Sequence, residues 1–240
     1  LMNGVDAAGK GETVNLLLEW LDPRNVEVNS FGDPSDEERE RPFFWRYWRS
    51  VPARGRIGIF YGSWYTDPIV RSVYQKGKKS ELDSAIRDIV DFECLQALDG
   101  ALFLKFWMHI SKKIQNKRLN KLSKDKKTRW RVTKRDFENL RHYDDFVGVC
   151  ETVLRETSTA HAPWHVIEAE DWRYRSLTVG QLLLDNLRTH LQKHRRRKPA
   201  APPPPSDVPP VPPGSGRRKE GGPSERRERG GAAGGPARGS

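Results

Sequence analysis

Cysteines are scarce in this chain of 240 residues, and the two present, Cys94 and Cys150, lie far apart with no metal-ligand spacing around them. This argues against a disulfide scaffold and a structural zinc site. Long apolar runs are also missing, because the longest, around residues 101–107, is interrupted by Lys105 and falls short of the roughly 20 residues of a membrane span. No secretion signal opens the chain, so we expect a cytoplasmic protein, and a first residue other than methionine suggests a piece of a longer one.

The positive charge of the chain is concentrated in two segments. Lys and Arg number 43 against 32 acids, a net charge of +11. Residues 112–135 hold 12 of these bases and one acid, and residues 193–240 hold 12 bases and four acids. The rest of the chain then carries 19 bases against 27 acids and is acidic. A uniformly basic, nucleic-acid-binding surface is therefore not expected.

Residues 193–240 contain 11 of the 17 prolines and nine of the 20 glycines. Such a segment buries too little apolar surface to offset its ordering entropy, so we expect a disordered tail after a domain of residues 1–192. A linker without a further role is the main interpretation. A polyproline ligand, a basic arm for nucleic acid and a segment read out of frame are the alternatives, although the arm would lack aromatic side chains for base stacking.

Residues 1–192 alternate between short apolar runs and longer amphipathic ones, which predicts a parallel sheet covered by helices on both faces, with ligands at the carboxyl ends of the strands. The first predicted strand starts with the chain itself and is expected to be truncated. The predicted strands are Leu1–Val5, Val26–Ser30, Arg56–Phe60, Ala101–His109 and Trp164–Glu168. The predicted helices are 11–20, 36–50, 80–98, 112–124, 134–156 and 176–191.

The first strand runs into a phosphate-loop motif. Residues 4–11 read Gly-Val-Asp-Ala-Ala-Gly-Lys-Gly, the G-x-x-x-x-G-K pattern between a strand and a helix. In this pattern the backbone N–H groups wrap a phosphate, and Lys10 reaches the outer phosphates. Gly11 replaces the usual Ser or Thr and has no hydroxyl for a magnesium ion, so Asp6 is the expected metal ligand. The phosphate-binding candidates in the loop are Gly4, Ala8, Gly9, Lys10 and Gly11.

The basic segment 112–135 is the second candidate for function. Four lysines are spaced four, four and three residues apart, so on a helix they share one face, where they repel one another unless an anion neutralises them. They are Lys113, Lys117, Lys121 and Lys124. Arg118, Arg129 and Arg131 add donors with the geometry for phosphate. This pattern indicates a lid that closes over phosphates, with a solvated lysine-rich surface as the alternative.

His161 and His165 have the spacing of a helical metal pair, but Pro163 between them argues against a metal site.

Several blocks of the sequence, in consecutive order, resemble the polyphosphate kinase 2 family. Within it the likeness is greatest to the first copy of polyphosphate:AMP phosphotransferases, which carry two such domains in tandem. The resemblance covers nearly all of residues 1–192. The blocks are Asp6–Gly11, Phe31–Glu38, Trp45-Arg46, Ile59–Tyr65, the lid Lys112–Trp130 and Thr157–Trp164.

The resemblance implies a three-layer α/β/α sandwich of the P-loop kinase type, with a five-stranded parallel sheet and a basic helical lid. It further implies polyphosphate and an AMP- or ADP-type nucleotide as substrates, magnesium as cofactor, and in-line phosphoryl transfer. Asp6, Lys10 and Arg118 are the catalytic candidates, and Arg46 joins the phosphate-binding ones. A homo-oligomer and a second domain of the same family are the expected partners.

One block departs from the family pattern. Where the family reads Phe-Asp-Arg-Ser-Trp-Tyr, this chain has Tyr61 and Gly62 in place of the Asp and the Arg. The leading interpretation is a polyphosphate-dependent nucleotide phosphotransferase, and the alternative is a non-catalytic copy that binds polyphosphate. An ATP-dependent nucleoside monophosphate kinase is a third interpretation, against which the long basic lid and the tryptophan-rich blocks argue.

Overall fold

The computed structural model describes residues 1–75 and 77–197, and within them five strands form one parallel sheet. The strands are β1 (Met2–Gly4), β2 (Val26–Ser30), β3 (Ile57–Tyr61), β4 (Lys105–His109) and β5 (Trp164–Glu168), in the spatial order β2-β3-β1-β4-β5. The connection after β1 runs to one side of the sheet, toward β2, and the connection after the adjacent strand β4 runs to the other side, toward β5. The carboxyl ends of β1 and β4 are therefore the topological switch point where ligands bind in such folds.

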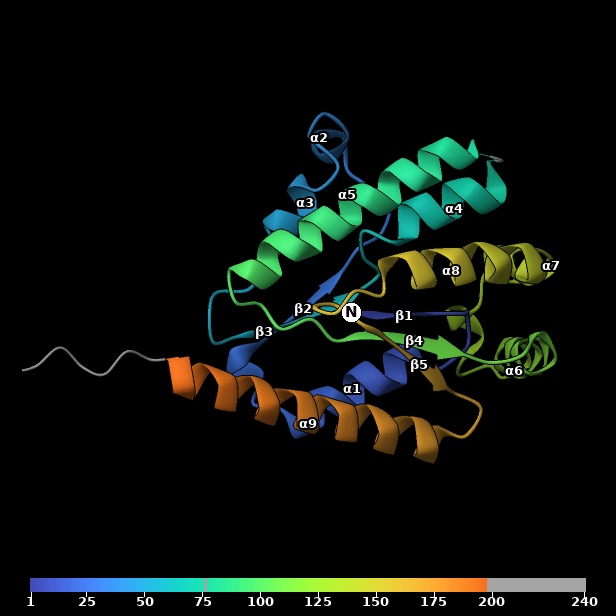
Figure 1. Cartoon of the computed structure of the whole chain (residues 1–240). Coiled ribbons are helices and arrows are strands. Elements are labelled where there is room, and N and C mark those ends of the chain that lie inside the picture. Colours follow the sequence, from blue (N-terminus) through green and yellow to red (C-terminus); the bar gives the residue numbers. More distant parts are fainter. Residues whose placement is uncertain (76, 198–240) are drawn as a thin grey trace, which may run out of the picture. The chain divides into compact units, whose positions relative to one another are not determined.

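Helices cover both faces of the sheet, as predicted (Figure 1). One face carries α1 (Lys10–Trp20) and α9 (Trp172–Arg197), and the other carries α4 (Thr66–Tyr74), α5 (Lys79–Leu98) and α8 (Tyr143–Thr157). The helices α6 (Lys112–Lys124) and α7 (Lys134–Arg141) lie beyond the carboxyl ends of the strands. The three-layer α/β/α arrangement is confirmed.

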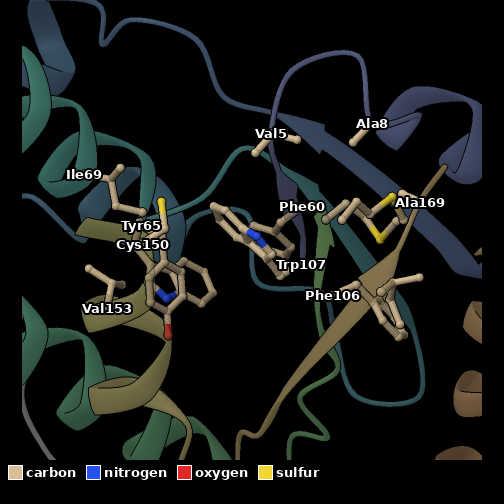
Figure 2. Close-up of a cluster of buried hydrophobic side chains, with 14 of the residues drawn as sticks. Val5, Ala8, Phe60, Tyr65, Ile69, Phe106, Trp107, Cys150, Val153 and Ala169 are labelled. Atoms are coloured by element: carbon tan, nitrogen blue, oxygen red, sulfur yellow. The ribbon is translucent and has the colours of Figure 1, made fainter. Parts of the chain in front are cut away.

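The core lies on both sides of the central strands because successive side chains of a strand alternate between the faces. Trp107 of β4 stacks on Phe146 of α8 with ring centroids 6.0 Å apart. Its neighbour Phe106 projects to the other face of the sheet (Figure 2). Figure 2 also shows Cys150, buried in α8 and part of the same hydrophobic cluster as Tyr65. The packing role predicted for Cys150 fits this position.

Several predicted element boundaries were wrong. The expected helix 36–50 is two short helices, α2 (Asp36–Arg39) and α3 (Trp45–Trp48), because Pro42 between them cannot continue a helix. The expected helix 134–156 is interrupted at His142, between α7 and α8. The helix α4 was not predicted, and α9 begins four residues earlier than expected and continues to Arg197. The fourth strand begins only at Lys105.

The helix α6 matches the predicted lid helix 112–124 at both ends. Ser111 caps it by accepting a hydrogen bond from the N–H of Ile114. Residues 198–240, most of the expected disordered tail, lie outside the described residues. Among the described residues no helix is both long and apolar enough to cross a membrane.

Candidate functional site

The predicted phosphate loop connects β1 to α1 at the switch point of the sheet. Gly4 and Gly9 both have positive φ angles, 137° and 91°. A Cβ at Gly4 would approach the backbone oxygen of Met108 to 2.1 Å, so only glycine fits where the loop leaves the strand. The strand–loop–helix context that the motif requires is present.

Lys10 folds back over the loop. Its Nζ donates hydrogen bonds to the carbonyl oxygens of Gly4 and Val5, both at 2.8 Å, and lies 3.9 Å from Oδ1 of Asp6. Burial lowers the pKa of the Lys10 ammonium, and the nearby charge of Asp6 opposes that effect. A partly buried cation with one carboxylate nearby is a favourable position for a phosphate.

Asp6 is held by a residue from a distant part of the chain. Its Oδ2 accepts a hydrogen bond of 2.8 Å from Nδ2 of Asn139 in α7, and Asn139 in turn accepts one of 2.6 Å from the hydroxyl of Tyr74. The Asp6 side chain is 34% exposed and lines the cavity described below. One oriented carboxylate beside a phosphate loop fits a magnesium ion whose other ligands are phosphate oxygens and water.

The described residues contain no group of three or more His, Cys, Asp or Glu side chains arranged for a metal ion. A metal with several protein ligands is therefore not supported within that part of the chain. Gly11 leaves the usual hydroxyl position empty, because a Cβ built there would meet no atom within 4 Å. The residues present thus fit a magnesium ion carried by the phosphate chain better than a metal held by the protein alone.

A cavity of about 680 Å³ opens beside the phosphate loop. Of the predicted site residues, Gly4, Asp6, Lys10 and Arg46 line it. Four arginines that were not predicted as site residues also line the cavity: Arg39, Arg41, Arg71 and Arg135. Aromatic side chains complete its lining, among them Phe31, Tyr47, Tyr74 and Trp107. The volume suits a drug-sized ligand, and the cations suit one that carries several negative charges.

Arg46 is fixed at the cavity wall by three neighbours. Its Nε lies 3.3 Å from Oε1 of Glu38, and its Nη2 donates a hydrogen bond to the backbone oxygen of Gly32. Its guanidinium carbon is 5.2 Å from the centre of the Phe31 ring. These contacts hold the guanidinium in place before any ligand arrives, which lowers the entropic cost of binding an anion.

Arg118 of α6 contacts the outside of the loop instead of lining the cavity. Its Nη1 donates to the backbone oxygen of Ala7 at 2.9 Å, and its Nη2 donates to that of Ala169 at 3.0 Å. Arg118 thus ties the lid helix to the phosphate loop and to the end of β5.

The other predicted lid cations also lie outside the cavity. Lys117, Lys121 and Arg129 are exposed, and Nη2 of Arg131 lies 3.5 Å from Oε1 of Glu12 in α1. The phosphate-binding role expected for these basic residues stays a prediction.

Arg175 is a contact of the loop that the sequence analysis missed. Its Nη1 donates to the backbone oxygen of Ala8 at 3.0 Å, and its Nη2 lies 3.5 Å from Oε2 of Glu12. The residue is 3% exposed, and burial lowers the pKa of its guanidinium. It comes from the start of α9, far along the chain from the loop, and no local sequence pattern indicates such a contact.

Tyr61, at the carboxyl end of β3, lines the same cavity at one of the two positions where the chain departs from the family pattern. Burial raises the pKa of its hydroxyl, and the charge of Asp6 raises it further, so the phenol is neutral. Gly62 has a φ of 74°, and a Cβ there would lie 3.0 Å from the backbone oxygen of Phe31. The site thus has a neutral side chain and a tight turn at these positions.

The sequence profile of the family described as Polyphosphate kinase 2 matches residues 1–195. A polyphosphate:AMP phosphotransferase of Pseudomonas aeruginosa is 49% identical over 191 residues, which cover 80% of this chain and 38% of that protein. An AMP/ADP-polyphosphate phosphotransferase of Meiothermus ruber is 35% identical over 187 residues, which cover 78% of this chain and 70% of that protein.

A solved structure supports the same relationship. The crystal structure of a polyphosphate kinase 2 from Arthrobacter aurescens matches with a TM-score of 0.75 at 34% identity, over 77% of this chain and 65% of that one. This chain spans about two fifths of the length of the Pseudomonas aeruginosa relative.

Proposed function

Because the chain belongs to the polyphosphate kinase 2 family, we propose that it forms a phosphotransferase domain that moves a phosphoryl group between inorganic polyphosphate and AMP or ADP. The observation that carries this proposal is the partly buried ammonium of Lys10 in a phosphate loop that opens on an arginine-lined cavity. The names of the relatives from Pseudomonas aeruginosa and Meiothermus ruber support the pair of substrates.

The described side chains suit in-line transfer without a covalent intermediate. Lys10 lies where it can leave the carbonyls of Gly4 and Val5 and bind the transferring phosphate. Arg46 is placed to hold a second phosphate at the cavity wall, and the exposed lysines of α6 to attract the rest of the polyanion. Asp6 is the residue that would hold magnesium, which would supply positive charge against the phosphate oxygens during transfer.

A second function is favoured by Tyr61 and Gly62. The main contribution of such a site to catalysis is electrostatic stabilisation of the transferring phosphoryl group. The absence of the family's Asp and Arg would therefore raise the barrier to phosphoryl transfer by several kcal/mol, on the order of the effect of removing one oxyanion-hole donor. Binding depends on Lys10, Arg46 and the lid, all of which remain. The alternative is therefore a copy that binds polyphosphate and supports catalysis elsewhere.

The decisive experiment incubates the full chain with polyphosphate, magnesium and AMP or ADP, and measures the ADP or ATP formed. Under the main proposal the chain turns over, and Lys10→Ala abolishes turnover. Lys79→Ala, an exposed lysine of α5 that does not line the cavity, is the matched control and should retain activity. Absence of turnover together with polyphosphate binding that is sensitive to salt and lost in Lys10→Ala would replace the main proposal with the second.

We also propose that the domain works beside a second domain of the same family, as the expected tandem arrangement requires. The long Pseudomonas aeruginosa relative, of which this chain covers 38%, supports that proposal. Sequencing the gene on both sides of this segment tests it, and a neighbouring copy with an intact Asp-Arg pair would assign catalysis to that copy.

A further inference from the structure

The two oxygens of the Asp6 carboxylate have different surroundings. Oδ2 accepts the hydrogen bond of 2.8 Å from Nδ2 of Asn139. Oδ1 lies 3.9 Å from Nζ of Lys10, which is beyond hydrogen-bond length, and it accepts no hydrogen bond from any residue in 1–75 or 77–197. Since an ionised carboxylate can accept several bonds, Oδ1 keeps its lone pairs for a ligand in the cavity that Asp6 lines.

The hydroxyl of Tyr74 determines which end of the Asn139 amide faces Asp6. The two ends of an amide have nearly the same shape, but one donates hydrogen bonds and the other accepts them. Tyr74 donates a hydrogen bond of 2.6 Å to Oδ1 of Asn139, so the NH2 end is left for Asp6. The reverse orientation would bring the amide oxygen against the carboxylate and lose the bond from the hydroxyl. Tyr74 thus acts on Asp6 through Asn139.

Tyr74 is itself held in place at the end of α4. Its ring packs edge-on against the ring of His142, with the centroids 5.4 Å apart. Burial raises the pKa of the Tyr74 hydroxyl, and the charge of Asp6 raises it further, so the hydroxyl keeps its proton at neutral pH and can donate. The last residue of α4 is therefore a fixed donor for the amide.

The helix α7 faces the phosphate loop with the side that carries Asn139. Asp136 is three residues earlier and shares that side of the helix. Burial lowers the pKa of Lys10, and the charges of Asp6 and Asp136 oppose that effect, which is consistent with Asp136 near the loop. Asp136 is engaged in capping α7, because its Oδ2 accepts a hydrogen bond of 2.6 Å from the N–H of Thr133. The bond between α7 and the carboxylate of the loop comes from Asn139.

We propose that Tyr74 and Asn139 are positioning residues of the candidate site, which orient the Asp6 carboxylate so that Oδ1 is left to bind a magnesium ion carried by the phosphate chain. This inference rests on the proposed function, in which Asp6 holds the metal. A ligand that is held before binding loses less conformational freedom when the metal arrives. Metal binding then depends on α4 and α7 both being in place, although neither Tyr74 nor Asn139 touches the metal.

Binding of a manganese complex to the full chain tests this role without any need for turnover. Mn2+ takes the place of magnesium, inorganic tripolyphosphate supplies a short phosphate chain, and the enhancement of water proton relaxation gives the affinity of the complex. Asn139→Leu should weaken binding by about 10–100-fold, the usual effect of removing a partner that orients a metal ligand. Tripolyphosphate without metal should bind this variant nearly as well as the wild type, whereas a general distortion of the loop would weaken both.

Tyr74→Phe is the milder variant, because it removes one hydroxyl and leaves the ring packed on His142. It should weaken binding of the complex by less than Asn139→Leu does. The double variant should bind no more weakly than Asn139→Leu alone, because the hydroxyl acts through the amide. Tyr174→Phe and Asn186→Leu make the same chemical changes in α9, away from the cavity, and are matched controls that should keep the wild-type affinity.

Electron–nuclear double resonance of the bound Mn2+ shows whether Asp6 is the ligand. In a chain labelled with 13C at the aspartate carboxyl carbons, the wild type should show a 13C coupling that Asp6→Asn abolishes. The coupling should be weaker in Tyr74→Phe, because fewer molecules then hold the carboxylate in the binding orientation. A wild-type spectrum without this coupling would contradict the proposal.

Three further results would overturn the positioning role: unchanged affinity for the complex in Asn139→Leu, equal losses with and without the metal, or additive losses in the double variant. Failure of the proposed function gives a different result. A chain that shows the expected metal binding but forms no ADP or ATP loses the main function and keeps this role. A chain that turns over while Asn139→Leu binds the complex normally loses only this role.

Discussion

The guanidinium of Arg175 occupies the space beside Gly9 where any other residue would place its side chain. A Cβ at Gly9 would come within 1.9 Å of Nη1 of Arg175, and the same nitrogen donates to the backbone oxygen of Ala8. Gly9 also has a φ of 91°, which side chains disfavour. The start of α9 therefore supports the phosphate loop from outside, and both residues are needed for that contact.

Replacement of Gly9 by alanine is expected to lower the free energy of unfolding by about 2 kcal/mol or more, from backbone strain and from displacement of Arg175. The matched control is Gly11→Ala, because a Cβ at Gly11 meets open space within helix α1. It should raise the stability by about 0.5–1 kcal/mol through helix propensity. Urea unfolding measures the free energy of unfolding of both variants. Equal stability of the two variants would show that Arg175 does not fill the space.

Arg175→Met should free the carbonyl of Ala8 and weaken polyphosphate binding, although Arg175 does not line the cavity. The expected loss of stability is about 1–3 kcal/mol, the cost of a buried acceptor without its donor. Arg175→Lys, which retains a donor, should restore part of both losses. Binding that is unchanged in Arg175→Met would mean that the loop keeps its shape without this contact.

Tyr61→Asp should increase phosphoryl transfer, because it returns a carboxylate to the cavity near Asp6. Gly62→Arg should lower the free energy of unfolding by about 1–2 kcal/mol, since Gly62 has a φ of 74° and little room beside Phe31. The measurement is initial rate and melting temperature for each single variant and for the double variant. A rate that falls in Tyr61→Asp would show that the phenol itself takes part.

The buried ion pair of Lys105 and Glu93 is expected to contribute to the stability of the domain, and its removal tests this. The atoms Nζ and Oε2 lie 2.7 Å apart, and both side chains are fully buried. Lys105→Met should cost about 3–5 kcal/mol because it leaves a buried carboxylate without its partner. Adding Glu93→Gln should recover part of that loss. The exposed pair of Arg54 and Asp99 is the control, where Arg54→Met should cost less than about 1 kcal/mol.

His165 in β5 should make stability depend on pH. Burial lowers the pKa of its imidazole below the ordinary 6.5. The unfolded chain then binds the proton more tightly than the folded one, so stability is greatest above pH 6.5 and falls as the pH drops below it. Urea unfolding of His165→Asn at several pH values should show a shallower fall. His161→Asn, at an exposed position, should leave the wild-type slope unchanged.

The lid lysines should control the salt dependence of polyphosphate binding. Lys117→Ala combined with Lys121→Ala removes two exposed charges of α6, so affinity at low salt should drop and its dependence on salt should flatten. Replacing the exposed Lys78 and Lys79 instead is the control for net charge. An equal effect of both pairs would indicate a general attraction of the protein for polyanions.

Elements with strong local sequence signals could be predicted from the sequence. The helix α6 has a serine cap and a basic repeat, and both ends were predicted. The helix α4 was not predicted, and it has Pro68 in its first turn, where proline is compatible with a helix. Contacts such as that of Asn139 with Asp6 join residues far apart in the chain, so no local pattern predicts them.

Contacts from α6 and α9 hold the phosphate loop from outside, and this should affect the rate at which the loop binds a phosphate-bearing ligand. The carbonyls of Ala7 and Ala8 are engaged by Arg118 and Arg175, so these parts of the loop are ordered when the domain folds and not when a ligand arrives. Within the loop, Lys10 would exchange its hydrogen bonds with Gly4 and Val5 for bonds to phosphate. Association should then be limited by diffusion and charge rather than by loop rearrangement, as in other preorganised sites.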